Sequence, residues 1–363
     1  MKNKKKTFVT IFTRCEDVHL IKDVGIIPYI MCKNHNYDSK IVCYQNSDDY
    51  QNLKNTPGLK IEFIKKKFNK YIDTLCYLIK NSKKIDVLNL YHMRPYANMM
   101  IRVYKLLNRK GKVYLKMDAD YIKFKYTSLA YNKLVAKRTI KLCKLVSCES
   151  KELSDMFKKD GLNIQYVPNG CLVYKPYNNE KKEKIILTVG RLGTYQKATE
   201  VLLDVFKELK EKYNSKYKLH LIGTMEEDFK DKYDKFLKDN PKLKADIKYF
   251  GNIADRSKLD SYYNKSEVFC LPSRFESFGL VVPEAAIHGC YIVTTDFGAA
   301  SKVLISDDKI GKICKIDDVS MMAKSISEYE NRKDNDVDYR INYMHDNFDW
   351  ESIVKKINEY LEK

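Results

Sequence analysis

An α/β protein with two domains, each a doubly wound parallel sheet covered by helices, is the fold that this sequence predicts. Short apolar runs alternate along the chain with longer segments of helical periodicity, the pattern of strand–helix–strand units. A length of 363 residues is enough for two hydrophobic cores of ordinary size. A polar stretch rich in Lys and Asn at 171–184 separates two such regions. We therefore expect one domain at 1–172, a second at 185–345 and a terminal helix at 346–363.

The first domain is predicted from apolar runs that end at polar or Lys-rich turns. Read as strands, these runs are 7–12, 40–44, 59–64, 87–91, 112–117, 145–148 and 165–167. Helices are expected at 21–34, 71–83, 96–108 and 129–143, and Pro28 suggests a boundary or a kink in the first of them. The predicted buried positions of the helices 71–83 and 96–108 are Ile72, Leu75, Cys76 and Ile79, and Met99, Met100, Val103 and Leu107.

The second domain repeats the pattern. Its expected strands are 185–189, 219–222, 247–250, 268–271 and 291–294. The helix at 199–212 is predicted to bury an apolar face made of Val201, Leu202, Val205, Phe206 and Leu209.

One stretch of the second domain carries the chemistry. The buried strand 268–271 ends at Pro272, and a polar loop leads to Pro283 and Glu284 at the start of a short apolar helix. Such a loop lies at the carboxyl end of its strand, where open α/β sheets bind ligands. The backbone N–H groups of 278–281 precede the helix and are expected to form an anion site.

The residues of this stretch resemble a known family. The run E-S-F-G-L-V-V-P-E places Glu276 and Glu284 eight positions apart, inside the wider frame P-S-x-x-E-S-F-G-L-x-x-P-E-A. This resembles the E-x7-E signature of retaining glycosyltransferases with the GT-B fold, family four (glycosyl transferases group 1). The resemblance implies two Rossmann-like domains that face a cleft, and a C-terminal helix that crosses back to the N-terminal domain. The resemblance to the family is strong from residue 145 to the end of the chain. Before residue 145, only the order of strands and helices resembles the family.

The resemblance implies roles for residues that bind the donor. Arg191 and Lys197, in V-G-R-L-G-T-Y-Q-K-A, would grip the phosphates, although Ala198 stands where the family usually has Gly. Glu276 would contact the sugar hydroxyls and Glu284 the ribose. The remaining donor-side positions are implied through their backbone groups: Phe278, Gly279 and Leu280 toward the sugar or β-phosphate, and Ile253 toward the base. Equally, Ile253 and its neighbour Phe250 are simply core residues.

Acceptor-side residues are expected in the first domain. His92 ends the strand 87–91, and relatives place a His in that region against the reacting sugar; a purely structural His is the alternative. Asp118, Asp120 and, less directly, His19 are further acceptor-side candidates. No metal site is expected, because Asp118 and Asp120 lie in the wrong domain for binding the donor, and no cofactor is expected beyond the nucleotide-sugar co-substrate.

Charge is distributed unevenly. Of the formal net charge of +19, residues 1–177 carry +20 (35 Lys and Arg, 15 Asp and Glu) and residues 178–363 carry −1. The first half is therefore expected to face an anionic partner, such as membrane headgroups, a phosphorylated acceptor or nucleic acid, unless the charge merely solvates the surface. Ten cysteines without a C-x-x-C pair, and no long apolar segment, indicate reduced thiols in the cytoplasm.

These observations predict a retaining, metal-independent glycosyltransferase. The expected donor is a UDP-sugar, and the expected acceptor is a glycan or lipid-linked molecule in cell-surface polysaccharide or glycolipid synthesis. The site would lie between the domains, and the protein would sit at the inner face of the plasma membrane. The alternatives are a basic nucleic-acid-binding protein, which the Lys content permits, and a GT-B sugar-nucleotide epimerase.

Overall fold

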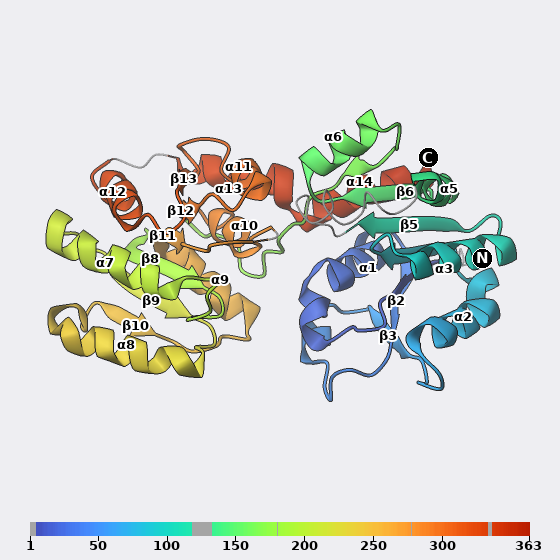
Figure 1. The fold of residues 1–363 in the computed structure, drawn as a ribbon, viewed down its shortest axis with the longest axis horizontal. Coiled ribbons are helices and arrows are strands. Elements are labelled where there is room, and N and C mark those ends of the chain that lie inside the picture. The colour runs from blue at the N-terminus through green and yellow to red at the C-terminus, as the bar shows by residue number, and fades with distance from the viewer. Residues whose placement is uncertain (1–4, 118–132, 180, 277, 333–335) are drawn as a thin grey trace. The chain divides into compact units, whose positions relative to one another are not determined.

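The structure, a computed structural model, describes residues 5–117, 133–179, 181–276, 278–332 and 336–363. Two compact units make up the chain (Figure 1). Unit 1 comprises Met1–Gly170 together with Trp350–Lys363, and unit 2 comprises Cys171–Asp349. Each unit has one parallel sheet with helices on its faces, which confirms the predicted α/β class. Asp118 and Asp120, two predicted acceptor-side residues, lie outside the described residues.

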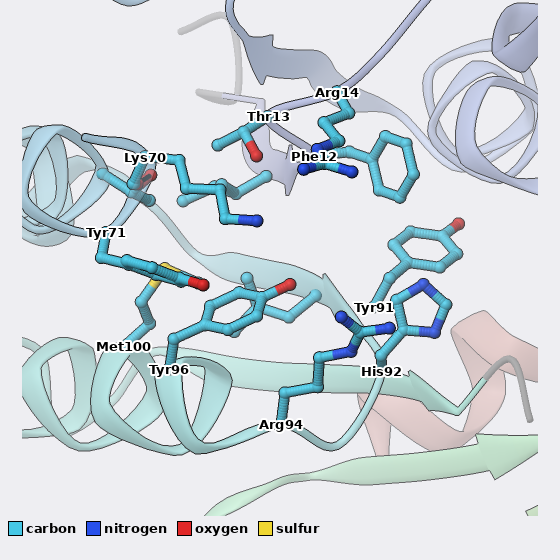
Figure 2. Close-up of a pocket in the computed structure, with 13 residues that line it drawn as sticks. Phe12, Thr13, Arg14, Lys70, Tyr71, Tyr91, His92, Arg94, Tyr96 and Met100 are labelled. Carbon is cyan, nitrogen blue, oxygen red and sulfur yellow. Dashed lines mark hydrogen bonds between the residues drawn. The ribbon is translucent and has the colours of Figure 1, made fainter.

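Unit 1 contains a seven-stranded parallel sheet in the order β3-β2-β1-β4-β5-β6-β7. Its strands are β1 (Lys6–Ile11), β2 (Tyr37–Cys43), β3 (Lys60–Phe63), β4 (Val87–Tyr91), β5 (Lys112–Met117), β6 (Leu145–Cys148) and β7 (Gln165–Tyr166). Its helices are α1 (Asp23–Asn34), α2 (Lys70–Asn81), α3 (Pro95–Leu107), α5 (Lys133–Leu142), α6 (Lys151–Lys159) and α14 (Trp350–Glu362). The strand order reverses between β1 and β4, so the chain segments that leave these strands diverge and open a crevice at their carboxyl ends (Figure 2).

The predicted buried face of α2 is wrong except for Leu75, which packs against the core of unit 1. Ile72 and Ile79 are 44% and 62% exposed, whereas Tyr77 and Leu78 pack in the core of unit 1. The buried side also carries Asp73, a residue that an apolar pattern excludes. Its carboxylate accepts hydrogen bonds from the Tyr44 hydroxyl at 2.8 Å and from the N–H groups that precede the helix. Because these donors satisfy the carboxylate, the polar side of the helix can face inward.

The prediction for α3 is wrong in part. Met100 is buried as expected, but Met99 is 41% exposed, and the remaining buried residues include Ile101 and Tyr104. The Tyr104 hydroxyl donates to the carbonyl oxygen of Ile85 at 2.8 Å, which allows a phenol to occupy the core. The helix α1 continues through the buried Pro28, so this proline marks no helix boundary.

The terminal helix α14 belongs to unit 1, although the residues that precede it belong to unit 2. Its apolar side, which includes Ile353, Val354 and Ile357, is buried, and the helix packs against α1 and β6. At its end, the Glu362 carboxylate accepts hydrogen bonds from Lys6 Nζ at 2.6 Å and from the Tyr37 hydroxyl at 2.8 Å. These contacts tie the last turn of the chain to β1 and β2.

We expect the variant Glu362→Gln to lose up to about 1 kcal/mol of stability at pH 7, because the contacts are partly solvated. The hydrogen bond from Lys6 is the main cause that lowers the pKa of Glu362 from 4.5 to about 2. A lowered pKa stabilises the fold above the unfolded value, so the difference from wild type should persist above pH 4.5 and shrink below it. Urea unfolding at several pH values measures this. Glu359→Gln, an exposed position on the same helix, is the control; an equal loss there would contradict the assignment.

Unit 2 contains a six-stranded parallel sheet in the order β10-β9-β8-β11-β12-β13. The strands are β8 (Glu183–Val189), β9 (Lys218–Ile222), β10 (Ile247–Tyr249), β11 (Ser266–Leu271), β12 (Tyr291–Thr295) and β13 (Gly311–Cys314). The helices are α7 (Thr199–Tyr213), α8 (Glu227–Asp239), α9 (Arg256–Lys265), α10 (Val281–Ala286), α11 (Ala299–Leu304), α12 (Val319–Glu330) and α13 (Val337–Phe348). Here the strand order reverses between β8 and β11.

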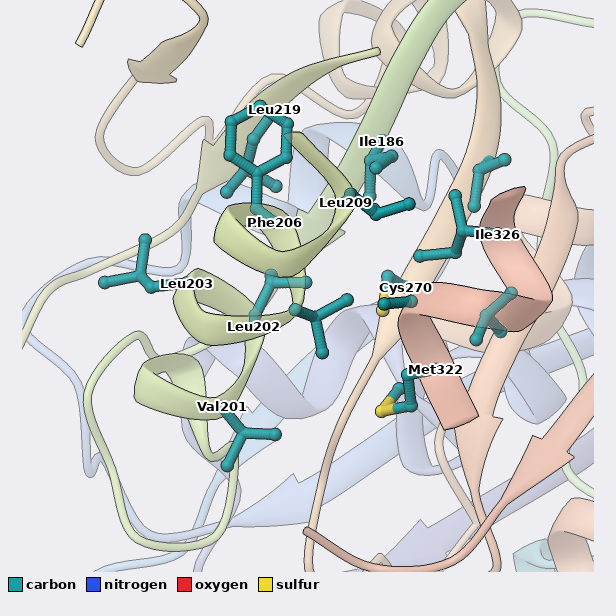
Figure 3. Close-up of a cluster of buried hydrophobic side chains, with 14 of the residues drawn as sticks. Ile186, Val201, Leu202, Leu203, Phe206, Leu209, Leu219, Cys270, Met322 and Ile326 are labelled. Carbon is teal, nitrogen blue, oxygen red and sulfur yellow. The ribbon is translucent and has the colours of Figure 1, made fainter. Parts of the chain in front are cut away.

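The apolar face predicted for α7 is confirmed. Its five predicted residues are all buried, and they pack against the sheet and against α12 (Figure 3). Of the helices in the described ranges, none is long and apolar enough to cross a membrane.

Candidate functional site

The donor-side residues of unit 2 gather where its strand order reverses. The loop after β8 carries Lys197, and the loop after β11 carries Glu276. Lys197 Nζ lies 2.5 Å from Glu276 Oε1, and the two side chains are only 16% and 8% exposed. The Ser273 hydroxyl donates to the same carboxylate oxygen at 2.7 Å. The structure therefore brings into contact two residues that are 79 positions apart. From the sequence, Lys197 was expected to bind the phosphates and Glu276 the sugar hydroxyls.

Gln196 and Arg274 connect these two loops further. The Arg274 N–H donates to the Gln196 carbonyl oxygen at 2.8 Å, and Gln196 Nε2 donates to the Phe275 carbonyl oxygen at 3.1 Å. The Arg274 guanidinium forms ion pairs with Glu200 at 2.8 Å and Asp317 at 2.9 Å, so its charge is already neutralised. Sequence reasoning missed Gln196, which adjoins the predicted Lys197.

Arg191 remains available to a ligand. It is exposed, its Nη2 donates to Gln196 Oε1 at 3.3 Å, and it forms no ion pair with any residue of the described ranges. Arg191 and Lys197 thus stand at the carboxyl edge of the sheet, beside loops that Gln196 holds together. This arrangement provides two cations for an anionic group.

The substitution at Ala198 has a structural consequence. Ala198 is buried and precedes α7 with φ 48° and ψ 46°, a left-handed conformation that favours glycine. Placing a Cβ there costs about 1–2 kcal/mol. The backbone therefore keeps the left-handed conformation that glycine adopts readily. Packing around the start of α7 compensates for the cost of the alanine Cβ.

Glu284, the second Glu of the motif, lies on α10 and has a partner that the sequence did not suggest. Arg256 Nη2 donates to Glu284 Oε1 at 2.6 Å, and the Tyr263 hydroxyl donates to Oε2 at 3.2 Å. Burial, followed by Glu284, holds the pKa of Tyr263 well above its ordinary value, so the phenol stays protonated. Both carboxylate oxygens are therefore fixed in place. Arg256 is the first residue of α9, the helix before β11, and this position was the one sequence feature that pointed to it.

The predicted backbone donors occupy the turn before α10. Gly279 has φ 75°, a conformation that favours glycine, and an added Cβ would approach the Phe297 ring at 3.0 Å. The Phe278 side chain is buried and packs near Phe348. Ile253 packs against the core of unit 2, and Phe250, 36% exposed, lies between two other aromatic rings. Because α10 is six residues long, its dipole contributes little to an anion site.

Unit 1 has a pocket where its own strand order reverses, between the ends of β1 and β4 (Figure 2). Its volume is about 150 Å³. The lining residues are Ile11, Phe12, Thr13, Arg14, Lys70, Tyr71, Thr74, Leu90, Tyr91, His92, Arg94, Tyr96 and Met100. The predicted His92 is among them, and the three cations of the lining were missed by the sequence reasoning. The signal for Arg14 and Arg94 was their position just after predicted strands.

The other predicted histidine plays a local role. His19 does not line the pocket; its Nδ1 accepts a hydrogen bond from the Glu16 N–H at 3.0 Å, and its ring packs against Phe12. Burial is the main cause that lowers its pKa. His92, by contrast, has φ 62°, and its N–H donates to the carbonyl oxygen of Lys116 at 2.8 Å.

Lys116 is the centre of a buried charged cluster beside the pocket, and sequence reasoning missed it. It is 0% exposed on β5, and its Nζ lies 2.8 Å from Asp23 Oδ2 and 3.1 Å from Glu149 Oε2. Asn169 Oδ1 accepts a hydrogen bond from the same ammonium group at 3.0 Å. One cation thus joins β5 to the segments that start α1 and follow β6 and β7. A single Lys inside an apolar strand was the available signal.

Comparison with known proteins identifies relatives of this chain. Residues 174–345 match the family model described as glycosyl transferases group 1. A 41.2 kDa protein of the cps region of Klebsiella pneumoniae is 27% identical over 341 residues, which cover 86% of this chain and 89% of that protein. The amylovoran biosynthesis glycosyltransferase AmsD of Erwinia amylovora is 23% identical, with 77% of each chain covered.

Solved structures share the fold. The Anabaena protein HepE, crystallised with UDP and glucose, superposes with a TM-score of 0.67 at 13% identity, covering 98% of this chain and 99% of that one.

Proposed function

We propose that this chain, whose residues 174–345 match the model of the glycosyl transferases group 1 family, is a retaining glycosyltransferase with the GT-B fold that uses a nucleotide sugar. The observation that carries the proposal is the Lys197–Glu276 pair with Arg191 beside it, where the strand order of unit 2 reverses. Open α/β sheets bind ligands at this position. A basic nucleic-acid-binding protein is not favoured, since the relatives with an assigned activity are glycosyltransferases.

The two cations would act on the leaving diphosphate. Lys197 and Arg191 would hold the phosphates, and negative charge would grow there as the bond between the sugar C1 and the phosphate oxygen breaks. Cations held in place before the reaction stabilise that charge without reorganising. The acceptor hydroxyl would attack C1 on the same face, and its proton would pass to the departing phosphate oxygen, so configuration is retained.

Glu276 would connect the diphosphate to the sugar. One of its oxygens binds Lys197 and Ser273, while the hydrogen bond of Oε2 among the described residues is a long one, 3.4 Å from Gln196 Nε2. That oxygen would accept hydrogen bonds from the donor-sugar hydroxyls. The neighbouring Lys197 would then be oriented toward the phosphates by the carboxylate that holds the sugar.

Two relatives support a proposal for the substrates. HepE has been crystallised with UDP and glucose, and AmsD acts in the biosynthesis of the polysaccharide amylovoran. On this support we propose a UDP-sugar as donor and a glycan or lipid-linked acceptor in cell-surface polysaccharide synthesis. We also propose that the reaction needs no metal cofactor.

A thermal-shift and turnover experiment tests this function. The full chain should be stabilised by UDP and by one or more UDP-sugars. With a matching acceptor, proton NMR should show a product of the same anomeric configuration as the donor sugar. Activity should survive EDTA, since Arg191 and Lys197 would supply the charge that a metal supplies elsewhere. An inverted product, or activity lost in EDTA and restored by Mg²⁺ or Mn²⁺, would overturn the corresponding part of the proposal.

Glu284→Gln should weaken UDP binding roughly tenfold and change kcat little, because hydrogen bonds to a charged group contribute about 1.5–3 kcal/mol. The ribose hydroxyls would make the same contact in the ground and transition states, so the loss appears in KM. Calorimetric titration with UDP measures it. Arg256→Gln should reproduce part of the loss by releasing Glu284. A fall in kcat at unchanged UDP affinity would show that Glu284 acts on the reacting sugar instead.

We propose that unit 1 docks on an anionic membrane surface. The first half of the chain carries the whole net charge, and its packed helices α2 and α3 expose apolar residues: Ile72, Ile79, Met99 and Leu106. A Lys or Arg near anionic lipid gains about 1 kcal/mol, so the clusters at 65–67 and 109–112 would suffice for reversible docking. The protein would then act at the inner face of the plasma membrane.

Liposome flotation tests the docking. The protein should float with anionic vesicles at low salt and be released at high salt. Leu106→Ser, at a position 75% exposed, should reduce flotation, whereas Ile316→Ser, at an exposed position of unit 2, should not. Equal recovery with neutral and anionic vesicles would show that the charge serves solubility alone.

A further inference from the structure

The pocket of unit 1 collects positive charge from three separate elements. Arg14 follows β1, Lys70 is the first residue of α2, and Arg94 immediately precedes α3. Figure 2 shows the three side chains projecting toward the same space, with the Tyr96 hydroxyl between them. Among the residues that the structure describes, no Asp or Glu lines the pocket.

In the part of the chain that the structure describes, these cations have no carboxylate partner, although Lys70 Nζ lies 5.1 Å from the centre of the Tyr71 ring. Across the described ranges, no carboxylate lies within ion-pair distance of Arg14, Lys70 or Arg94. The carboxylate of the first turn of α2, Asp73, is not in the lining and is bound by the Tyr44 hydroxyl. Three like charges that converge without a counter-charge repel one another, and an anionic ligand would remove that repulsion.

The two helices that start at the pocket add to its positive potential. α2 and α3 have 12 and 13 residues, and the N-terminal end of a helix of this length attracts anions. Asn69 already caps the N–H groups of Tyr71 and Ile72. In α3, by contrast, the N-cap residue is Arg94, whose side chain makes no capping hydrogen bond.

The walls of the pocket are aromatic. The rings of Tyr71 and Tyr96 lie 5.2 Å apart at 52°, and Phe12 packs edge-on against Tyr91. Aromatic faces suit the apolar face of a sugar ring, and phenol hydroxyls can bond its hydroxyl groups. The cavity of about 150 Å³ has room for on the order of ten water molecules, hence for one monosaccharide-sized group.

We infer that this pocket binds the acceptor through an acidic sugar, one that carries a carboxylate or a phosphate on its ring. Arg14, Lys70 and Arg94 would hold the oxyanion, and the tyrosines would hold the ring. This rests on the proposed function, since the sugar so held would be part of the acceptor. It narrows the acceptor from any glycan to one with an acidic residue at or next to the end that is extended.

Direct binding measurements on the full chain with saturating UDP test the inference. Ligand-observed NMR and calorimetry would compare glucuronate, glucose 6-phosphate and neutral glucose. The acidic sugars should bind at least about tenfold tighter than glucose, because hydrogen bonds to ionised groups are roughly twice as strong as neutral ones. Comparing glucuronate with glucose 6-phosphate then shows which oxyanion the pocket prefers.

Charge-removing variants locate the binding. Arg14→Gln, Lys70→Gln and Arg94→Gln should each weaken the acidic sugar about tenfold or more. Because none of these residues has an ion-pair partner in the described ranges, the variants should fold normally. Lys80→Gln, at an exposed position toward the other end of α2, should bind as the wild type does.

The outcomes separate this inference from the proposed function. Acidic sugars that bind no tighter than glucose, or that are insensitive to all three variants, would overturn the inference, and UDP binding in the same samples would leave the proposed function standing. Binding of acidic sugars without any UDP-induced stabilisation would instead contradict the nucleotide-sugar donor.

Discussion

Replacing Lys197 with alanine is expected to lower kcat by about 10²–10³-fold, the usual cost of removing one preorganised group that stabilises developing charge. Lys197 is 16% exposed and lies 2.5 Å from Glu276, so its ammonium is held in one place before the donor arrives. Arg191→Ala is expected to have a comparable effect through the other side of the diphosphate. Steady-state kinetics at saturating UDP-sugar measures both losses.

Two further variants separate catalysis from stability. Lys197→Ala leaves the buried Glu276 without its cation, which also weakens unit 2, whereas Lys197→Ala combined with Glu276→Gln removes that unpaired charge. The double variant should regain stability and remain inactive. Lys210→Ala is a matched control, since Lys210 lies on α7, is 15% exposed and pairs with Asp246 away from the site. Near-normal turnover in Lys197→Ala with saturating donor would remove Lys197 from the mechanism.

Lys116→Met is expected to destabilise unit 1 by about 3–5 kcal/mol, because breaking a buried ion pair leaves its carboxylates without compensation. Asp23 and Glu149 are 15% and 6% exposed, so water cannot replace the ammonium at either of them. The substitution conserves side-chain length, which limits the loss of packing. Urea unfolding followed in unit 1 measures the change.

A control on the same strand distinguishes burial from charge. Lys112→Met, on β5, removes a cation that is 30% exposed and 3.5 Å from Glu362, and it should cost no more than about 1 kcal/mol. Adding Asp23→Asn and Glu149→Gln to Lys116→Met should recover much of the loss. If Lys116→Met were as stable as Lys112→Met, the two carboxylates would not depend on Lys116.

The spacing of apolar residues predicted the buried face of a helix correctly where that face contains apolar residues alone. The face of α7 was predicted correctly because its inward residues are all apolar. The faces of α2 and α3 were predicted only in part, because Asp73 and Tyr104 are buried with partners supplied by Tyr44 and Ile85. The spacing of apolar residues cannot predict a buried polar side chain whose hydrogen-bond partner lies far away in the sequence.

The sequence by itself determined the strands β1 to β12, the loops after β8 and β11 that carry Arg191, Lys197 and Glu276, and the excess charge of the first half. These features depend on local periodicity, on short motifs and on composition. Tertiary structure decided the pairs and the groups: Lys197 with Glu276, Glu284 with Arg256, the carboxylates around Lys116, and the three cations of the unit 1 pocket. The reason is the strand order, which places β1 beside β4 and β8 beside β11 and so brings together loops that lie far apart along the chain.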